Sequence, residues 1–443
     1  MRIHAPRSTV VGVRPSDGER EPEPRSGRTT RPLPVESGDT SADHELARRL
    51  GAAFGLQKAG VFYALIGIIV AFELSTTITG KPNYLTLANS ANVLQQASIP
   101  GVIAIFSTIV LITGNFDLSI ASTAGLSAAI ALRLIDVENG ALVIVLCLAV
   151  GALVGVVNGF LVVYRRINAF IVTLGTLTIV RGLVYVASGE TSVVATARDL
   201  QPLSTGTVDL SVRWIPVAVG VALLLGVLWR RRRRLGRFSL LGVLALAGLL
   251  IVGGLGSHGT IALNHSVLIT LGLGILVWFV MRKTVLGRRL YAVGSNAEAA
   301  RLAGVPVRRY QFGAFVVNGT GAAFAGLMLA GLYQAADPSI FTGQELVIIT
   351  AAVIGGTSLF GGSGDVLKSL VGMVILAALT NGMNFQALSA AWQSTVQGII
   401  LILAAAVYTA QGSGRRRSGF SSLVGGGQPS RVDDPARAAQ RRD

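Results

Sequence analysis

The chain has 443 residues, of which 51% are hydrophobic and only 14% are charged, and its formal net charge is +16. Soluble domains carry about 25% charged residues, so this composition excludes an ordinary soluble protein and indicates a membrane protein. The basic runs flank apolar segments and lack interleaved aromatic residues, so they indicate membrane topology and no nucleic-acid surface. The single cysteine, Cys147, excludes an intrachain disulfide.

The two ends of the chain are polar. Residues 1–50 are rich in Pro, Glu, Ser and Arg, and residues 412–443 are basic and rich in Gly and Ser. Such segments cannot bury enough apolar surface to offset the entropy lost on ordering. We therefore expect two disordered cytoplasmic tails, 1–50 and 412–443, on either side of a transmembrane domain at 51–411.

Between the tails lie about twelve apolar runs, most of them near the ~20 residues that a membrane-spanning helix needs. We expect an all-α polytopic membrane protein, a bundle of about twelve hydrophobic segments of which ten to twelve span the bilayer. In the fourth run, Gly151, Gly155 and Gly159 recur every four residues and predict a smooth face for close packing by another helix. The runs fall near 59–79, 94–113, 117–134, 141–164, 167–188, 212–229, 238–256, 262–281, 310–333, 344–361, 364–384 and 392–410.

Two pairs of neighbouring runs are separated by only a few residues, at glycine-rich junctions. The junctions, 113–122 and 355–365, share a G-x-x-[DS]-L-x-x-x-S frame, in which Gly114 corresponds to Gly355 and Ser122 to Ser363. Short glycine-interrupted segments in corresponding halves are a pointer to a transport pathway. We expect short broken or re-entrant helices here, although chance similarity between glycine-rich loops is the competing explanation.

The loops also predict an orientation. With the N-terminus in the cytoplasm, every strong basic cluster falls on the cytoplasmic side, and the opposite loops carry few arginines or lysines. Both termini are therefore expected inside the cell. The clusters are Arg165 with Arg166, Arg230–Arg237, the loop 282–309, and Arg415–Arg417.

The loop 282–309 is polar between two long apolar runs and carries arginines at both ends. Within it, residues 295–304 are expected to form a short helix: Ser295 or Asn296 can cap its N-terminus, Glu298 lies in the first turn, and Gly304 ends it. Such a helix of small residues is a surface for a partner to dock against. A solvated connector is the alternative.

Several polar residues interrupt the apolar runs and junctions. Asp117 is ionisable and costs ~3 kcal/mol or more in lipid, so it should face protein, water or substrate. Amide and carboxylate side chains near aromatic rings suit a polyhydroxylated ligand. Hydrogen bonding between helices is the commoner role of such residues. The candidate pathway residues are Asp117, Ser119, Asn168, Glu345 and Asn381.

The sequence contains no G-x-x-x-x-G-K-[ST] phosphate loop and no constellation typical of a catalytic triad. The histidines show no metal-ligand spacing; they are His4, His44, His258 and His265. We therefore expect a non-catalytic chain that holds neither a metal ion nor a cofactor.

From about Leu87 to Tyr408 the sequence resembles the ribose/xylose-type permeases of bacterial ABC sugar importers, and the extra pair of runs around 230–255 is similar to the xylose-type branch. The chain departs from the family pattern at Gly114, Asn115 and Phe116, where the family has Gly-Gly-Ile, and at Thr380, where the xylose type often has aspartate. The matching stretches are Asp117-Leu118-Ser119, 168–175 (NAFIVTLG), Arg181-Gly182, 286–289 (LGRR), 292–304 (AVGSNAEAARLAG), 353–359 (VIGGTSL), Gly361-Gly362, Asn381-Gly382-Met383 and Trp392-Gln393.

This resemblance implies the permease subunit of an ATP-driven importer in the bacterial plasma membrane, with a monosaccharide, and specifically a pentose such as xylose, as substrate. It implies a second copy of the chain, an extracytoplasmic sugar-binding protein, and an ATP-binding cassette subunit that holds ATP and Mg. The family's coupling segment corresponds here to 296–304, which places the contact with the ATP-binding subunit at Asn296, Glu298, Ala299, Ala300 and Gly304.

An ion-gradient-driven secondary transporter of a small polar solute is the alternative. Asp117, Arg181 and Glu345 would then be relay groups. That alternative leaves the capped helix on the arginine-rich side unexplained. A membrane-bound enzyme has no nucleophile, metal set or cofactor loop in this sequence to support it.

Overall fold

The computed structural model describes residues 56–211, 221, 260–400 and 402–403. The two expected tails and the expected runs 212–229 and 238–256 lie outside the described residues, apart from Val221, and the run 392–410 is described only in part. The described chain is mostly helical, and six of its helices are long and apolar enough to cross a membrane. These are α3 (Leu87–Ile112), α5 (Gly140–Gly159, continued by the π-helical turn Phe160–Tyr164), α6 (Ala169–Ser188), α9 (His265–Lys283), α12 (Val307–Tyr333) and α14 (Val366–Phe385).

Three further apolar helices are α2 (Leu56–Ile78), α4 (Ile120–Leu134) and α13 (Gln344–Ile354). Helix α4 has 15 residues and α13 has 11. At 1.5 Å per residue they measure about 22 and 16 Å, less than the ~30 Å hydrocarbon core of a bilayer. Both adjoin the glycine-rich junctions. The non-helical segment 113–119 precedes α4, and the non-helical segment 355–365 follows α13.

Helix α3 begins earlier than the apolar run 94–113 predicts. The Thr86 side chain accepts a hydrogen bond from Asn89 N at 3.1 Å and so caps a helix whose first turns are polar. Hydropathy alone misses these turns, because they carry Asn89, Ser90 and Asn92. The helix continues through Pro100 and ends at Ile112.

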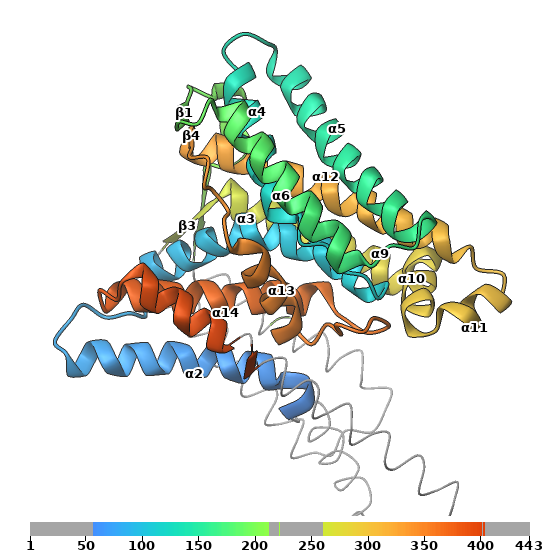
Figure 1. Ribbon diagram of the computed structural model, residues 1–443. Helices are drawn as coiled ribbons and strands as arrows, with labels where there is room; N and C mark the ends of the chain where they lie inside the picture. Colours follow the sequence, from blue (N-terminus) through green and yellow to red (C-terminus); the bar gives the residue numbers. More distant parts are fainter. Residues whose placement is uncertain (1–55, 212–220, 222–259, 401, 404–443) are drawn as a thin grey trace, which may run out of the picture. The chain divides into compact units, whose positions relative to one another are not determined.

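Helix α12 lies at the centre of the bundle and packs against α5, α4 and α3 (Figure 1). A Cβ added to Gly151 of α5 would overlap the Gly319 carbonyl of α12, and one added to Gly155 would overlap the Phe315 carbonyl. The two backbones therefore touch along the glycine face of α5. This contact confirms the close helix packing that the four-residue glycine spacing predicts.

The short elements gather at the two ends of the bundle (Figure 1). One end, called here the coupling end, holds α10 (Val285–Ser295), α11 (Ala297–Leu302) and the junctions 113–119 and 355–365. The opposite end, the ribbon end, holds two antiparallel strand pairs and the 3-10 helix Arg198–Leu203. Strand β1 (Val193–Val194) pairs with β4 (Ala335–Ala336), and β2 (Thr207–Ser211) pairs with β3 (Thr260–Asn264).

Candidate functional site

The coupling end presents a short exposed helix, α11. Asn296 ends α10 and caps α11, because its Oδ1 accepts a hydrogen bond from Ala299 N at 2.9 Å. Glu298 in the first turn forms an ion pair with Arg301 at 2.5 Å, and this carboxylate raises the pKa of the Arg301 guanidinium above its usual value. The chain leaves the helix at Gly304, whose φ is +80°. The expected capping is therefore present, with Asn296 rather than Ser295 as the cap.

The residues of α11 divide into two faces. Ala300 is buried, and its methyl group packs against the rest of the protein. Asn296, Glu298 and Ala299 are exposed, as is Gly304 beyond the helix. Leu302 lies two residues after Ala300, on the opposite side of the helix, and 79% of its surface is exposed. Sequence reasoning missed this leucine because an apolar residue in a short helix is ordinarily expected to be buried.

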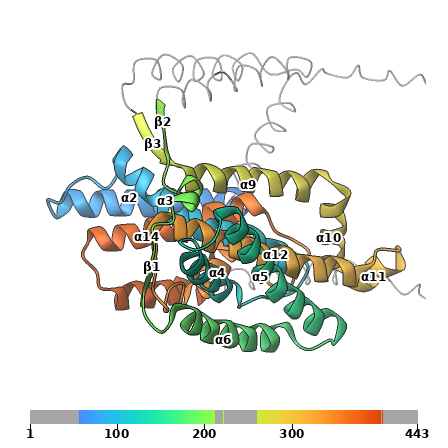
Figure 2. The ribbon, with the colours of Figure 1, turned by 90° about the horizontal axis from the view of Figure 1, so that it is seen from above.

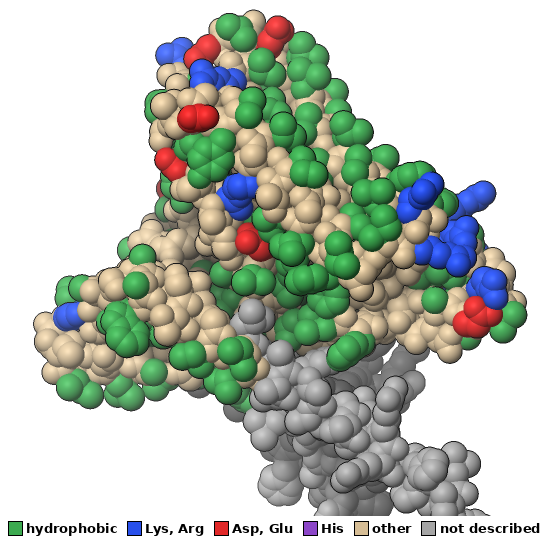
Figure 3. All heavy atoms as spheres, in the orientation of Figure 1, with side chains coloured by type: hydrophobic (Ala, Val, Ile, Leu, Met, Phe, Trp, Pro, Cys, Tyr) green, Lys and Arg blue, Asp and Glu red, His purple; other side chains and the backbone are tan. Residues whose placement is uncertain are grey.

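Basic side chains surround this helix, and Figure 3 shows them gathered where α10 and α11 lie. Arg288 and Arg289 of α10 and Arg308 and Arg309 at the start of α12 are all exposed. The coupling end therefore offers a positively charged surface with the highly exposed Leu302 at its edge.

Helix α11 is anchored by a contact among three backbone segments, called here the glycine junction: Ile112–Gly114, Gly294–Ser295 and Gly361–Gly362. Gly362 N donates a hydrogen bond to Ile112 O at 2.9 Å. A Cβ added to Gly361 would lie 2.7 Å from Gly114 Cα, and one added to Gly294 would overlap Ile112 O. The two junctions with related sequences therefore touch each other, and both touch the last turn of α10.

Polar contacts hold the same region together. Tyr291 Oη donates to Gly364 O at 2.9 Å, and Arg282 forms an ion pair with Asp365 at 2.6 Å. Burial raises the pKa of the Tyr291 phenol, the Arg282 charge opposes this increase, and the Asp365 charge adds to it. Asp365 also caps α14 by accepting hydrogen bonds from Leu367 N and Lys368 N. These contacts connect α9, α10 and α14.

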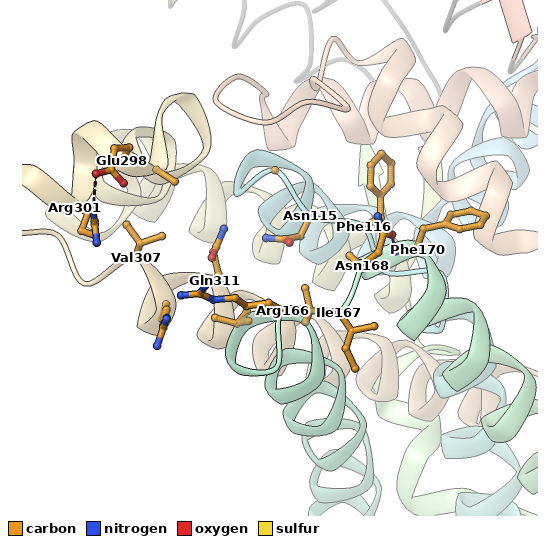
Figure 4. A pocket seen from close by; sticks show the side chains of 16 residues that line it. Asn115, Phe116, Arg166, Ile167, Asn168, Phe170, Glu298, Arg301, Val307 and Gln311 are labelled. Atoms are coloured by element: carbon orange, nitrogen blue, oxygen red, sulfur yellow. Dashed lines mark hydrogen bonds and ion pairs between the residues drawn. The ribbon is translucent and has the colours of Figure 1, made fainter.

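Beside α11 lies a hollow of about 790 Å³, lined by residues of 114–116, 162–170, 297–301 and 307–311. Figure 4 shows Glu298 and Arg301 on one side of it and Asn168 and Phe170 on the other. Asn168 is exposed and caps α6, since its Oδ1 accepts from Phe170 N at 2.9 Å. The structure thus places Asn168 at the coupling end, on a hollow that residues 114–116 also line, and apart from Glu345 and Asn381.

Asp117 is the hub of a buried hydrogen-bond network. Its Oδ1 accepts from Ser119 Oγ at 2.7 Å, from Ser119 N at 3.0 Å and from Asn158 Nδ2 at 3.3 Å. Its Oδ2 accepts from Asn318 Nδ2 at 3.0 Å. Thr176 Oγ1 in turn donates to Asn158 Oδ1 at 2.7 Å. The network connects the chain before α4 with α5, α6 and α12, and it brings Asp117 and Ser119 together.

Glu345 lies at the start of α13. Its Oε2 is 4.0 Å from Arg181 Nη2, and within the described residues this buried oxygen accepts no hydrogen bond. Arg181 also donates to Ile340 O at 3.1 Å and to Thr342 Oγ1. Asn381 of α14 is buried, and its Oδ1 likewise has no hydrogen-bond partner in the described part of the chain. Each residue follows one that lines a cavity, Gln344 and Thr380 respectively.

That cavity, of about 290 Å³, lies between α3, α12, α13, α14 and the helical segment 390–400. A second hollow of about 280 Å³ shares Gln344 and Gln397 with it. The glutamines that line the first cavity were not among the candidate pathway residues, because they come from segments far apart in the chain. The polar lining residues are Gln95, Gln96, Tyr333, Gln344, Thr380 and Gln397.

The residues described by the structure include no group of three His, Cys, Asp or Glu side chains that could hold a metal ion. The cavity's amides and hydroxyls each donate and accept hydrogen bonds, and the Tyr333 ring adds an aromatic face. The chemistry of the cavity lining therefore suits a small hydroxylated solute, while the coupling end presents an exposed, positively charged helix.

The model of the family "branched-chain amino acid transport system / permease component" matches residues 89–405. The chain is similar to the xylose transport system permease protein of Escherichia coli strain K12, with 35% identity over 369 residues, 80% of this chain and 93% of that protein. It is similar to the ribose import permease protein of the same strain, with 31% identity over 350 residues, 78% of this chain and 92% of that protein. The xylose transport system permease protein of Haemophilus influenzae is 34% identical over 363 residues, 78% of this chain and 94% of that protein. No solved structure matches the chain.

Proposed function

Because this chain belongs to the branched-chain amino acid transport system / permease component family, we propose that it forms the translocation pathway of an ATP-driven importer for a monosaccharide. It is a sugar permease subunit of the xylose/ribose type and an inner-membrane protein. The names of its relatives support a pentose as the substrate.

The observation that carries the proposal is the exposed, capped helix α11 with Leu302 at its surface. An ATP-binding subunit, which holds ATP and Mg, would dock on 296–304, and the leucine would enter its surface. Two copies of the chain would form the pathway, and a sugar-binding protein would deliver the sugar at the ribbon end. The glycine junction would then transmit a movement of α11 to the segments 113–119 and 355–365. Such a coupled movement favours a switch between two packings of the bundle.

For the sugar we propose the glutamine-lined cavity as part of the path. Glu345 and Asn381 would support it, since each adjoins a lining residue and each has a buried oxygen without a hydrogen-bond partner among the described residues. Asn168 would line the path where it opens beside α11. Asp117 and Ser119 would support the path by fixing the helices around it.

Leu302→Glu tests the docking surface. We expect it to weaken binding of the ATP-binding subunit by about 2 kcal/mol, roughly 30-fold in affinity, because a buried apolar anchor is replaced by a charge. The measurement is co-purification of the two subunits followed by ATPase assay. Val137→Glu is the matched control, since Val137 is also highly exposed, at 74%, but lies beyond the end of α4 opposite the coupling end. Equal recovery of the ATP-binding subunit with Leu302→Glu and with the wild type would contradict docking at α11.

Gln344→Leu and Gln397→Leu test the cavity. Loss of one sugar hydrogen bond, worth about 1 kcal/mol, should lower the rate of xylose uptake at limiting concentration roughly fivefold. Uptake is measured in proteoliposomes that contain the ATP-binding subunit and are supplied with the binding protein. Gln393→Leu serves as the control, because Gln393 donates to Asn384 Oδ1 and Leu388 O outside the cavity. If all three variants transport equally, the sugar does not pass these glutamines.

A further inference from the structure

An apolar groove of about 720 Å³ lies between α3, α9, α10 and α12, away from the glutamine cavity. We call it the α9–α12 groove. Side chains such as Ile109, Val277, Val280 and Val317 form its surface. Figure 2 shows α9 and α10 along one edge of the bundle with α12 beside them. Ile275 and Phe279 on the same helix α9 are 57% and 53% exposed, so this edge presents apolar side chains to its surroundings.

Two arginines close the groove at the coupling end. Arg289 and Arg309 both line it, together with Tyr310. Arg289 Nη1 donates to Tyr310 Oη at 3.0 Å, which directs the guanidinium toward the groove. Among the described residues neither arginine has a carboxylate partner, whereas Arg282 is paired with Asp365 and Arg301 with Glu298.

We propose that the α9–α12 groove binds an anionic phospholipid, with an acyl chain along its apolar surface and the phosphate on Arg289 and Arg309. Arginine forms two parallel hydrogen bonds with a phosphate and is more weakly hydrated than lysine, which suits a site at the edge of a bilayer. Basic pockets between helices at the cytoplasmic side of a membrane bind acidic headgroups for this reason. Tyr310 has both an apolar ring and a polar hydroxyl and suits the boundary between chain and headgroup.

The charges favour a lipid over a second copy of this chain. At the coupling end the described residues carry carboxylates only at Asp117, Glu298 and Asp365, of which the first is buried and the other two are paired with arginines. A second copy therefore brings no free carboxylate in its described part to Arg289 and Arg309. A lipid phosphate supplies the missing charge.

A lipid bound in the α9–α12 groove would also affect α11. Leu290 of α10 and Pro306, which precedes α12, both line the groove, so the two segments that flank α11 border the same site. A bound lipid would fill the space between them and hold the base of α11. Removal of the lipid should therefore loosen α11 without altering the glutamine cavity.

The test uses two independent changes. Gly313 lines the groove, and a Cβ added there meets no atom within 4 Å, so the side chain of Gly313→Leu starts in open space and occupies the groove. Arg289→Gln combined with Arg309→Gln removes the headgroup contacts and leaves the groove open. Gly67→Leu on α2 is the matched control for size because its Cβ also meets open space, and Arg165→Gln with Arg166→Gln is the control for charge.

The full-length chain is purified in detergent, titrated with dioleoyl phosphatidylglycerol or dioleoyl phosphatidylcholine, and examined by native mass spectrometry. We expect one phosphatidylglycerol retained in preference to phosphatidylcholine, at least a tenfold loss of this binding in both groove variants, and none in the controls. The double arginine variant should also lose the salt dependence of binding, since the headgroup contact is electrostatic.

Equal retention of the two lipids, or phosphatidylglycerol binding that survives both groove variants, would overturn the proposal. So would a wild-type chain that retains no lipid, because another segment of the chain would then occupy the groove. A change from dimer to monomer in Gly313→Leu with unaltered lipid binding would assign the groove to a second copy instead. Failure of the lipid proposal would leave the proposed ATP-driven transport standing, because transport is tested separately by uptake and ATP hydrolysis.

Discussion

Gly294→Val is expected to abolish ATP-dependent sugar uptake. Even a single Cβ at this position would overlap Ile112 O and lie 2.6 Å from Gly362 N, and both are backbone atoms that cannot rotate away. The end of α10 must therefore withdraw from both junction segments, at a cost of about 1–3 kcal/mol or more for overpacking. Because α11 follows directly after Asn296, its connection to the rest of the bundle is broken.

The measurement is uptake together with ATP hydrolysis by the assembled transporter. We expect the variant to bind the ATP-binding subunit, since the surface of α11 is unchanged, but to show no stimulation of hydrolysis by the sugar-loaded binding protein. Gly272→Val on α9 is the control, because a Cβ there meets open space. Size-exclusion chromatography of both variants in detergent separates loss of coupling from loss of folding. Wild-type uptake by Gly294→Val would show that the glycine junction does not transmit motion.

Asp117→Ala is expected to cause a large loss of stability. It leaves Ser119, Asn158 and Asn318 without their shared acceptor in a buried region, and each unsatisfied buried donor costs about 1–3 kcal/mol. The measurement is the thermal unfolding temperature in detergent, and we expect a fall of several degrees or failure to accumulate in the membrane.

One further variant, with its control, separates charge from hydrogen bonding at this position. Asp117→Asn keeps the acceptor for Ser119 and places an amide donor against Asn318 Nδ2, so an intermediate loss is expected. Asp337→Asn is the control, because this carboxylate is exposed and accepts hydrogen bonds from Ser339 and Ser192, which lower its pKa. Asp117→Ala with wild-type thermal stability would contradict the structural role of the network.

Local chemistry in the sequence was sufficient to predict several features of the fold. The Asn296 cap, the end of α11 at Gly304 and the close packing of Gly151 and Gly155 each depend on a few neighbouring residues or on a single helical period. The long apolar helices were likewise predictable from run lengths, although the polar first turns of α3 were not.

The features that the sequence did not predict are contacts between distant segments. Gly114 and Gly361 belong to the two junctions that share a sequence frame, but their mutual contact depends on how α3 and the segment after α13 are placed in the bundle. The glutamine cavity combines Gln95, Gln344 and Gln397 from separate helices, so no periodicity identifies it. The burial of Ala300 and the exposure of Leu302 depend on how α11 is rotated against its neighbours, which six residues of sequence do not fix.

The same contacts bear on the choice between an ATP-driven importer and an ion-gradient-driven transporter. Asp117 accepts four hydrogen bonds within the described bundle, an arrangement that suits a fixed structural role. Glu345 and Arg181 form a loose ion pair, so they are the relay groups that a gradient-driven mechanism would use. The two mechanisms can be distinguished by the energy source that drives uptake, which is ATP in one and an ion gradient in the other.

Uptake of labelled xylose into proteoliposomes tests this difference most directly. The vesicles contain the chain and its ATP-binding subunit, the sugar-binding protein is added outside, and ATP and ionophores are varied independently. We predict uptake that requires ATP inside the vesicles, persists when ionophores dissipate every ion gradient, and is lost in Leu302→Glu. Uptake without ATP that is driven by a proton or sodium gradient would contradict the account and assign the chain to the gradient-driven transporters.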